Sequence, residues 1–139
     1  MKRALCEIRI LQDVHSGKPW ICMRAEAAAL FWDAKDAADS IMLFLDGVAP
    51  DEYDRDLLRR RAVERGFEIV GEALNRLRRI DPATASRIPK LANAVGLRNV
   101  LIHGYAEIID RRVFDTAVKD LPELLEVLTT LMDEVNDSR

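Results

Sequence analysis

The stretch ERGFEIVGEALNRL, residues 64–77, decides the fold, because it lies in a segment whose apolar residues recur at helical spacing. Over about residues 54–79 these residues return at three- and four-residue steps, which places them on one face of a long helix. They are Leu58, Ala62, Ile69, Ala73 and Leu77. Gly66 and Gly71 lower the helix propensity of the same segment. Glycines at such positions predict that a neighbouring helix approaches closely.

The segments on either side of this helix are also helical in character. Residues 25–46 are rich in alanine, place their apolar side chains on one side, and lead to the stop signal Gly47. Asp81 and Pro82 open a short helical turn, with the acid as N-cap and the proline in the first position. The chain is thus expected to pass from helix to helix through short turns.

Two further helices are predicted toward the C-terminus. Pro89 opens one of them, which ends at Gly104. Asp110 caps the last helix, in which Pro122 allows a kink or a restart before the helix ends near Val135. No strand-like alternation longer than three residues is present. The predicted fold is therefore all-α, an up-down bundle of four to five helices.

The composition is that of an ordinary globular domain. The 139 residues are 49% hydrophobic and 32% charged, which fits one domain. No apolar run approaches the roughly 18 residues that cross a bilayer, and early charges leave no signal-peptide core. Cys6 and Cys22 form no C-x-x-C pair. We therefore expect a cytoplasmic protein with no membrane contact, no metal and no other cofactor.

Residues 1–22 do not fit the helical plan. They contain a turn-like Ser16-Gly17-Lys18-Pro19 and precede Met23, an alternative initiator. They are interpreted as an upstream extension, a short extra helix or an artificial remnant, and these alternatives stay open. The predicted domain occupies residues 23–139.

The charges are unevenly distributed. The net charge is −3, yet residues 55–98 carry 11 basic and 5 acidic side chains. Such a positive field suits a polyanion binder. Helical arginines such as those at 59–61 could instead pair with nearby acids, among them Glu64 and Glu68, on solvated faces. Both interpretations remain open at this point.

The stretch LRNVLIHGY, residues 97–105, carries the candidate chemistry. An imidazole gives and takes protons near neutral pH, and a guanidinium grips phosphate oxygens, so His103 and Arg98 together can cleave a phosphodiester without a metal. On an ideal helix the two project about 140° apart. Either the helix unwinds near Gly104, or two copies of the chain face each other across a twofold axis, which we favour. Asn99 shares a helix face with His103.

Three stretches together resemble the HepT-like HEPN proteins, small prokaryotic toxins encoded beside a minimal nucleotidyltransferase antitoxin. Residues 64–77 resemble the second-helix signature, residues 97–105 the R-x-x-x-x-H-x-Y motif, and KDLPEL, residues 119–124, the last-helix pattern. The resemblance covers about residues 27–135. It implies a HEPN helical bundle, a homodimer, and a metal-independent ribonuclease with Arg98 and His103 as catalytic residues. It also implies that the antitoxin silences the toxin by transferring AMP to Tyr105.

The mechanism expected from these residues is transesterification of RNA, with Asn99 holding a phosphate oxygen or fixing the imidazole tautomer. Glu72 either orients His103 from a facing helix or pairs with Arg76 four residues later, and we favour the pair. Tyr105 could instead be an aromatic interface residue. Two other functions stay open: a non-enzymatic HEPN module that binds nucleotide or the nucleotidyltransferase, and a purely structural helical dimer.

Overall fold

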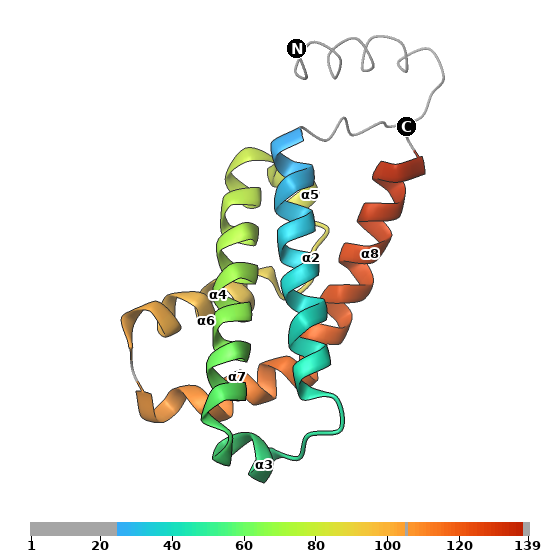
Figure 1. Cartoon of the computed structure of the whole chain (residues 1–139). Helices are drawn as coiled ribbons and strands as arrows, with labels where there is room; N and C mark the ends of the chain where they lie inside the picture. The colour runs from blue at the N-terminus through green and yellow to red at the C-terminus, as the bar shows by residue number, and fades with distance from the viewer. Residues whose placement is uncertain (1–24, 105, 138–139) are drawn as a thin grey trace, which may run out of the picture.

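The computed structural model describes residues 25–104 and 106–137, and the side chains of residues 26–104 and 111–137. These residues form seven helices and no strand (Figure 1). The helices are α2 (Ala25–Leu45), α3 (Pro50–Arg55), α4 (Leu57–Ile80), α5 (Pro82–Ala85), α6 (Leu91–His103), α7 (Ala106–Lys119) and α8 (Leu121–Asp137). Five of them are long and two are short, so the predicted all-α bundle is confirmed. The predicted extension, residues 1–22, lies outside the described residues.

The long helices lie in two directions. Helix α2 runs antiparallel to α4 and α8 and packs against both (Figure 1). Helices α6 and α7 form a hairpin that runs across the lower part of this group, with α6 packed against α4. The apolar faces of these helices meet in one core. Its largest fully buried side chains include Phe31, Ile41, Tyr53, Phe67, Leu74, Leu77, Leu97 and Leu128.

The two glycines of α4 mark close approaches, as the sequence predicts. A Cβ on Gly66 would lie 2.5 Å from Cγ1 of Ile41 on α2. A Cβ on Gly71 would overlap Cβ of Arg98 and lie 2.9 Å from the carbonyl oxygen of Ala94, both on α6. Real Cβ atoms do not tolerate such contacts, because protein interiors are close-packed. Helix α4 is therefore the central element, and its two glycines set how closely α2 and α6 pack.

Several predicted helix ends are confirmed. Helix α2 ends just before Gly47, which takes a positive φ of 67°. The Asp81 carboxylate accepts a hydrogen bond from the Thr84 backbone N–H at 3.2 Å and caps α5. Helix α6 ends at His103, and Gly104 adopts the left-handed conformation, with φ 73°. Left-handed glycine is the usual way to end a helix, because it has no Cβ to clash.

Three predicted starts are displaced. The helix expected from about Asp54 begins at Leu57, because Asp56 is non-helical and its carboxylate caps Arg59 N–H at 3.0 Å. The helix expected from Pro89 begins at Leu91. The prediction that Asp110 caps the last helix is wrong, because α7 already begins at Ala106. Helix α7 begins two residues after Gly104, which leaves no room for a longer loop before it.

The predicted restart at Pro122 is confirmed. Helix α7 ends at Lys119, and α8 begins at Leu121 with the proline in its first turn. A proline is favourable there, because the first turn of a helix leaves its N–H groups without intrahelical acceptors. The region predicted as one last helix that kinks or restarts is therefore two helices, α7 and α8.

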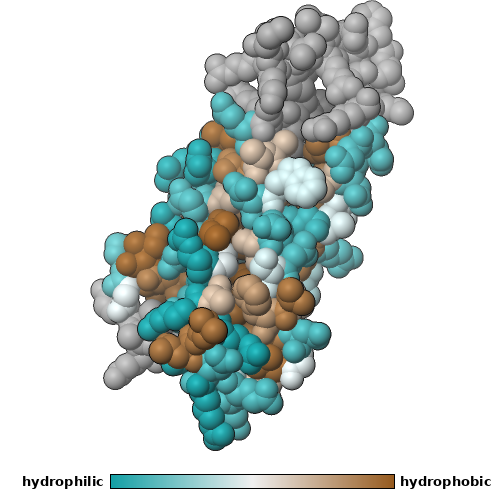
Figure 2. Space-filling view, viewed as in Figure 1, coloured by the Kyte–Doolittle hydropathy of each residue, from teal (hydrophilic) through white to brown (hydrophobic). Residues whose placement is uncertain are grey.

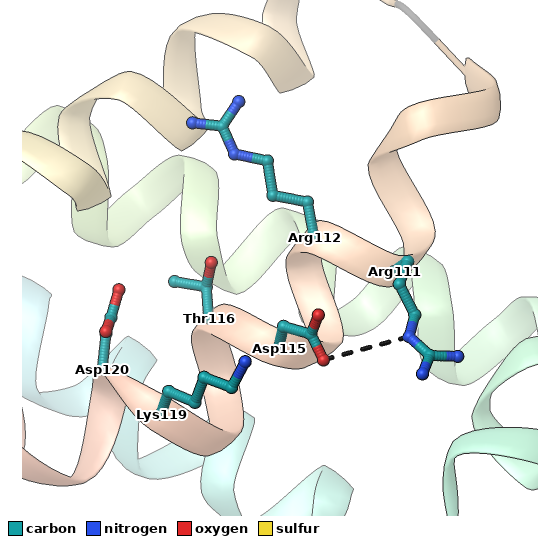
Figure 3. Close-up of a pocket in the computed structure, with 6 residues that line it drawn as sticks. All are labelled: Arg111, Arg112, Asp115, Thr116, Lys119 and Asp120. Carbon is teal, nitrogen blue, oxygen red and sulfur yellow. Dashed lines mark ion pairs between the residues drawn. The ribbon is translucent and has the colours of Figure 1, made fainter.

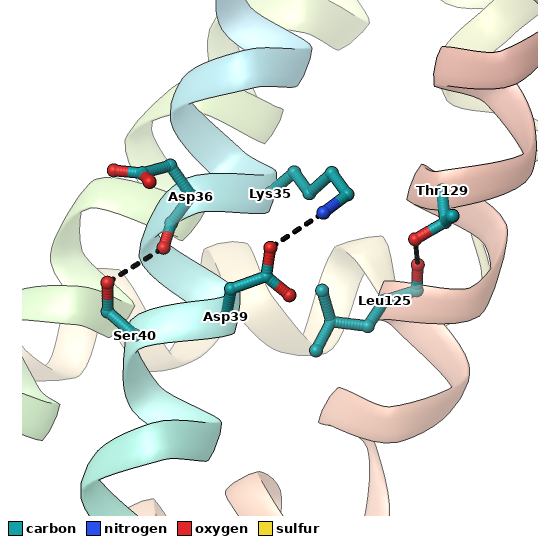
Figure 4. Close-up of polar contacts among 6 residues, drawn as sticks. All are labelled: Lys35, Asp36, Asp39, Ser40, Leu125 and Thr129. Carbon is teal, nitrogen blue, oxygen red and sulfur yellow. Dashed lines mark hydrogen bonds and ion pairs between the residues drawn. The ribbon is translucent and has the colours of Figure 1, made fainter.

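The polar contacts that Figure 4 shows on α2 and α8 are local to each helix. On α2, Lys35 pairs with Asp39 at 2.6 Å and Ser40 donates to the carbonyl oxygen of Asp36 at 2.9 Å. On α8, the Thr129 hydroxyl donates to the Leu125 carbonyl oxygen at 2.8 Å. Pairs of this kind contribute only about 0.2–0.5 kcal/mol. The packing of α2 with α8 therefore depends on apolar burial.

No helix in the described ranges has both the length and the apolar character that a bilayer crossing requires.

Candidate functional site

Arg98 lies at the crossing of α6 and α4. Its Cβ occupies the space that a side chain at position 71 would need, so the arginine is in close contact with the α4 backbone. Its neighbours Ala94, Val95 and Leu97 on α6 are buried. The side chain as a whole remains 26% exposed. The stem is thus fixed by packing while part of the guanidinium reaches solvent.

Two neighbours hold the Arg98 guanidinium. Its Nη2 forms an ion pair with Oε2 of Glu72 on α4 at 2.7 Å. Its Nη1 donates to Oδ1 of Asn99 at 3.0 Å. The Nε is buried and has no hydrogen-bond partner among the described residues. Charge-assisted hydrogen bonds of this kind are short and directional, so they fix the orientation of the planar group.

The partner of Glu72 differs from both predictions. We favoured Arg76, and the alternative was His103, but the carboxylate pairs with Arg98. The reason is the helix crossing: Gly71 brings α6 so close that the adjacent Glu72 reaches across to Arg98. Because a pair of this kind joins two helices, it is invisible to spacing rules within one helix. Glu72 therefore supports the site, but through the guanidinium.

The Asn99 side chain accepts a hydrogen bond from Arg98. Among the described residues no hydrogen bond joins it to His103, and its expected contact with a phosphate oxygen stays a prediction. The amide NH₂ group has no hydrogen-bond partner among the described residues. It remains available to a ligand. The structure thus joins Glu72, Arg98 and Asn99 in one hydrogen-bonded chain.

His103 is the last residue of α6 and is exposed. The helix stays regular to this point, because the Gly104 N–H donates to the Val100 carbonyl oxygen at 3.2 Å. Unwinding near Gly104, the first predicted way to bring the two residues together, is therefore absent from the described helix. His103 lies about 7.5 Å along the axis from Arg98 and about 140° around it. Within one copy of the chain the two side chains diverge.

Two other predictions concern the AMP acceptor and metal binding. Tyr105, the predicted AMP acceptor, lies outside the described residues, as do Cys6 and Cys22. Within the described part of the chain, no cluster of three or more His, Cys, Asp or Glu side chains is arranged to hold a metal ion.

Much of the basic segment is paired. Arg61 contacts Glu64 at 2.8 Å and Arg65 contacts Glu68 at 3.0 Å, both within α4. Arg59 contacts its own helix cap, Asp56, at 3.2 Å. The interpretation of these arginines as partners of nearby acids is therefore confirmed at these positions. Their positive field is weaker than the count of charges indicates, because each has a carboxylate beside it.

A groove along α7, with three basic and two acidic side chains, was not predicted (Figure 3). It is shallow, with a volume of about 370 Å³. Its lining residues all come from the last part of α7 and the residue after it: Arg111, Arg112, Asp115, Thr116, Lys119 and Asp120. The signal for it was present, because residues three, four and seven apart share a helix face. Residues 112, 115, 116 and 119 have this spacing. Acidic residues outnumber basic ones after position 106, however, and such a balance does not predict an anion-binding surface.

Comparisons with known proteins agree with this architecture. The model of the family described as ribonuclease HepT-like matches residues 34–131. Three curated relatives each carry the name "Putative RNase". One, from Caldanaerobacter subterraneus subsp. tengcongensis, is 32% identical over 78 residues, which are 56% of this chain and 69% of that protein.

The other two relatives come from Methanocaldococcus jannaschii. One is 28% identical over 103 residues, covering 73% of this chain and 92% of that protein. The second is 23% identical over 112 residues, covering 81% of this chain and 92% of that protein. No solved structure matches the chain. The matched region runs from the middle of α2 to the middle of α8 and includes Glu72, Arg98, Asn99 and His103, so the chain belongs to the HepT-like ribonuclease family.

Proposed function

We propose that this protein is a metal-independent endoribonuclease and the toxin of a toxin–antitoxin pair. The family assignment supports ribonuclease function. The observation that carries the proposal within this chain is the state of Arg98, a partly exposed guanidinium whose orientation is fixed by Glu72 and Asn99. Such a group is preorganised to stabilise charge on a phosphate. His103, five residues after Arg98 on the same helix, supplies an imidazole, the side chain that most often acts as a general acid or base.

The proposed reaction is transesterification within RNA. One imidazole removes the proton of a ribose 2′-hydroxyl, and the oxygen attacks the adjacent phosphorus. The bond to the 5′-oxygen breaks, and a second imidazole protonates this leaving group. Arg98 neutralises the charge that develops on the phosphoryl oxygens. The products are a 2′,3′-cyclic phosphate and a 5′-hydroxyl, and each proton transfer contributes about 10²–10⁴ to the rate.

A twofold dimer would supply the second imidazole. Within one copy His103 and Arg98 diverge, so a single chain offers each phosphate only one of the two groups. Apolar residues beside the site support a contact with another surface: Ile102 follows Arg98 by four positions and is 52% exposed, and Ile69 precedes Glu72 by three and is 36% exposed. Apolar side chains also interrupt the hydrophilic surface seen in Figure 2. Exposed apolar residues that flank polar groups are typical of interaction sites.

Glu72 acts in this proposal as a positioning residue for Arg98. Its carboxylate pairs with Nη2 of Arg98 and so limits the guanidinium to one orientation. Removing the charge of Glu72 without changing its size, in Glu72→Gln, keeps an acceptor but weakens the attachment. We expect kcat to fall about tenfold with KM little changed, because the fixed orientation of the guanidinium is lost. The same loss for Glu68→Gln, whose carboxylate pairs with Arg65, would contradict a specific role.

The proposed regulation is AMP transfer to Tyr105 by a cognate minimal nucleotidyltransferase. Tyr105 follows His103 by two positions, so attached AMP would add bulk and negative charge near the imidazole. Incubation with the nucleotidyltransferase and ATP should add the mass of one AMP to the wild type and none to Tyr105→Phe. An equal gain in Tyr105→Phe would remove this assignment.

The decisive test is RNA cleavage in excess EDTA by the wild type, His103→Ala and Arg98→Ala. We expect the wild type to cleave and both variants to lose activity. A substrate with a single 2′-deoxy position at the cleavage site should resist cleavage at that position alone, because it lacks the nucleophile. Cleavage that stopped in EDTA, or that survived both substitutions, would exclude this mechanism. Expression toxicity that is lost in His103→Ala would connect cleavage with the role of a toxin.

One observation favours a second candidate, a HEPN module that binds nucleotide or the nucleotidyltransferase without cleaving RNA. Arg98 already has a carboxylate partner in Glu72, which reduces its attraction for a phosphate. If the wild type failed to cleave any RNA but bound the nucleotidyltransferase tightly, this candidate would replace the ribonuclease.

A further inference from the structure

Arg112 and Arg111, adjacent cations of the groove along α7, differ in their surroundings. Arg111 turns toward Asp115, and the Arg111 Nε lies 4.0 Å from the Asp115 Oδ1 (Figure 3). Arg112 instead points away from Asp115 toward α6 (Figure 3). The second carboxylate of the groove, Asp120, accepts a hydrogen bond from Asn93 Nδ2 at 3.3 Å. Among the side chains that the structure describes, none forms an ion pair or hydrogen bond with Arg112.

The position that Arg112 reaches on α6 is a glycine. Its Nη2 lies 3.9 Å from the point that a Cβ on Gly96 would occupy. Any larger side chain at position 96 would fill the space in front of the guanidinium. Gly96 therefore leaves one side of a planar, permanently charged donor group open within a groove. This is an arrangement that suits a phosphate, because the guanidinium fork matches two phosphate oxygens.

The open side of Arg112 is on the same face of α6 as His103. Seven residues separate Gly96 from His103, which brings the helix back to within about 20° of the same direction, about 10 Å farther along the axis. Arg98 projects from the nearly opposite face, toward α4. The Arg112 guanidinium therefore lies beside the face of α6 that carries the imidazole, and the two are too far apart to hold one phosphate together.

We propose that Arg112 is a substrate-binding residue that holds an RNA phosphate neighbouring the cleaved one. The proposal rests on the ribonuclease function above and extends it to a binding path along the groove of α7. Lys119, one heptad after Arg112 on α7, lines the same groove and continues the path away from His103. Arg112 and Lys119 would bind the backbone of single-stranded RNA and not its bases, because a cation is attracted to any phosphate whatever the sequence.

The test compares Arg112→Ala with Arg111→Ala, a matched control. The two arginines are adjacent on one helix and both are exposed, but Arg111 is occupied by Asp115. With a tetranucleotide substrate we expect Arg112→Ala to raise KM about tenfold, the loss of one charge-assisted contact, and to leave kcat within about twofold. Arg111→Ala should change KM less than twofold. Equal effects of the two substitutions would overturn the proposal.

Substrate length separates the neighbouring phosphate from the cleaved one. A dinucleoside monophosphate has only the phosphate that is cut, so Arg112→Ala and the wild type should cleave it with the same kcat/KM. A tetranucleotide has flanking phosphates and should show the difference. A loss of equal size on both substrates would place Arg112 at the cleaved phosphate or show a general defect, and would overturn the assignment.

Binding provides a readout that does not need cleavage. In the His103→Ala background, fluorescence anisotropy with a labelled single-stranded RNA should show weaker binding for Arg112→Ala and a salt slope reduced by about 0.7, the value for one phosphate on a single strand. Gly96→Asp, which places a carboxylate in front of Arg112, should weaken binding in the same way without removing any cation. If the wild type cleaves RNA and these binding effects are absent, the phosphate site at Arg112 is contradicted and the ribonuclease proposal is not. If the binding effects are present and the wild type does not cleave RNA, the ribonuclease proposal is contradicted and the phosphate site is supported.

Discussion

Arg98 and His103 lie on the same helix, five residues apart, and their surroundings are opposite in kind. Around Arg98 the structure is dense: α4 approaches so closely that position 71 must be glycine, and Glu72 and Asn99 fix the guanidinium. Around His103 the helix has ended and the side chain is exposed. One half of the proposed site is thus built by the fold of a single chain. The other half depends on something added to it, which we propose is a second copy and the RNA itself.

The largest expected effect is on cleavage at the exposed half. His103→Ala should lower the cleavage rate by more than about 10²–10⁴, the contribution of a single proton transfer, because both transfers use this imidazole. The free energy of unfolding should change by less than about 0.5 kcal/mol, because the His103 side chain is exposed and its removal leaves no cavity in the core. Single-turnover cleavage and urea unfolding measure the two quantities. A clear loss of stability would show that His103 is part of the packed structure, and the contrast with Arg98 would disappear.

The packed half should show a mixed effect. Arg98→Ala should lower the cleavage rate by about 10²–10³, the usual loss for one electrostatic donor. It should also lower the free energy of unfolding by about 1 kcal/mol, because the stem leaves its contact with α4 and Glu72 loses its partner. Arg76→Ala, on α4 but exposed, is the matched control for removing an arginine. An activity loss without any loss of stability would mean that the packing around Arg98 is dispensable.

Substitution of the α4 glycines separates site geometry from general stability. Gly66→Ala and Gly71→Ala each force a side chain into an occupied space and should cost about 1–3 kcal/mol. The neighbour of Gly66 is the side chain of Ile41, which is distant from the site, whereas the neighbour of Gly71 is Arg98. Well below the melting temperature, only Gly71→Ala should lower the cleavage rate, by about tenfold. Equal rates for the two variants would show that the Arg98 position tolerates movement.

The smallest effect is expected far from both halves. Arg87, between α5 and α6, forms a bidentate pair with Glu134 of α8, at 2.7 and 2.9 Å. The hydrogen bond and charge of Arg87 lower the pKa of Glu134. The pair therefore stabilises the fold above the unfolded-state pKa of Glu134, and this contribution is lost as the pH falls through the lowered pKa. Because both side chains are largely exposed, Glu134→Gln should cost no more than about 0.5 kcal/mol at pH 7.

The check on this last prediction is urea unfolding of the wild type and Glu134→Gln at pH 7 and at a pH below the lowered pKa. The difference should be present at pH 7 and vanish in acid. A difference that persisted in acid would mean that Glu134 contributes through packing. Cleavage should be unaffected, because neither residue is near α6 beyond its start.

Local signals in the sequence predicted most of the fold. Apolar spacing, Asp81 with Pro82, and Gly104 predicted helices and ends that the structure confirms, because caps and helix faces are set by neighbouring residues. The prediction at Asp110 was wrong because it used the preference of aspartate for helix N-caps. The next helix begins earlier, at Ala106, directly after the helix end at Gly104. Gly66 and Gly71 predicted close approaches, yet a single sequence could not say which helices would approach.

The candidate site was less predictable, because its contacts join separate helices. The Glu72–Arg98 pair depends on how α6 crosses α4, and spacing within α4 pointed to Arg76 instead. The open side of Arg112 depends on Gly96 of another helix, so the sequence offered only an ordinary pair of arginines. His103 could be singled out by its chemistry alone, since it is the only histidine of the main body.

The contact between Gly71 and Arg98 also bears on how this protein can change over evolutionary time. The two positions share a single volume, so any larger residue at 71 must arrive together with a displacement of the arginine. A lineage that abandons cleavage is freed from that constraint and can fill position 71. Among related chains, a bulky residue at position 71 would therefore indicate that Arg98 no longer serves in cleavage, even where His103 is retained.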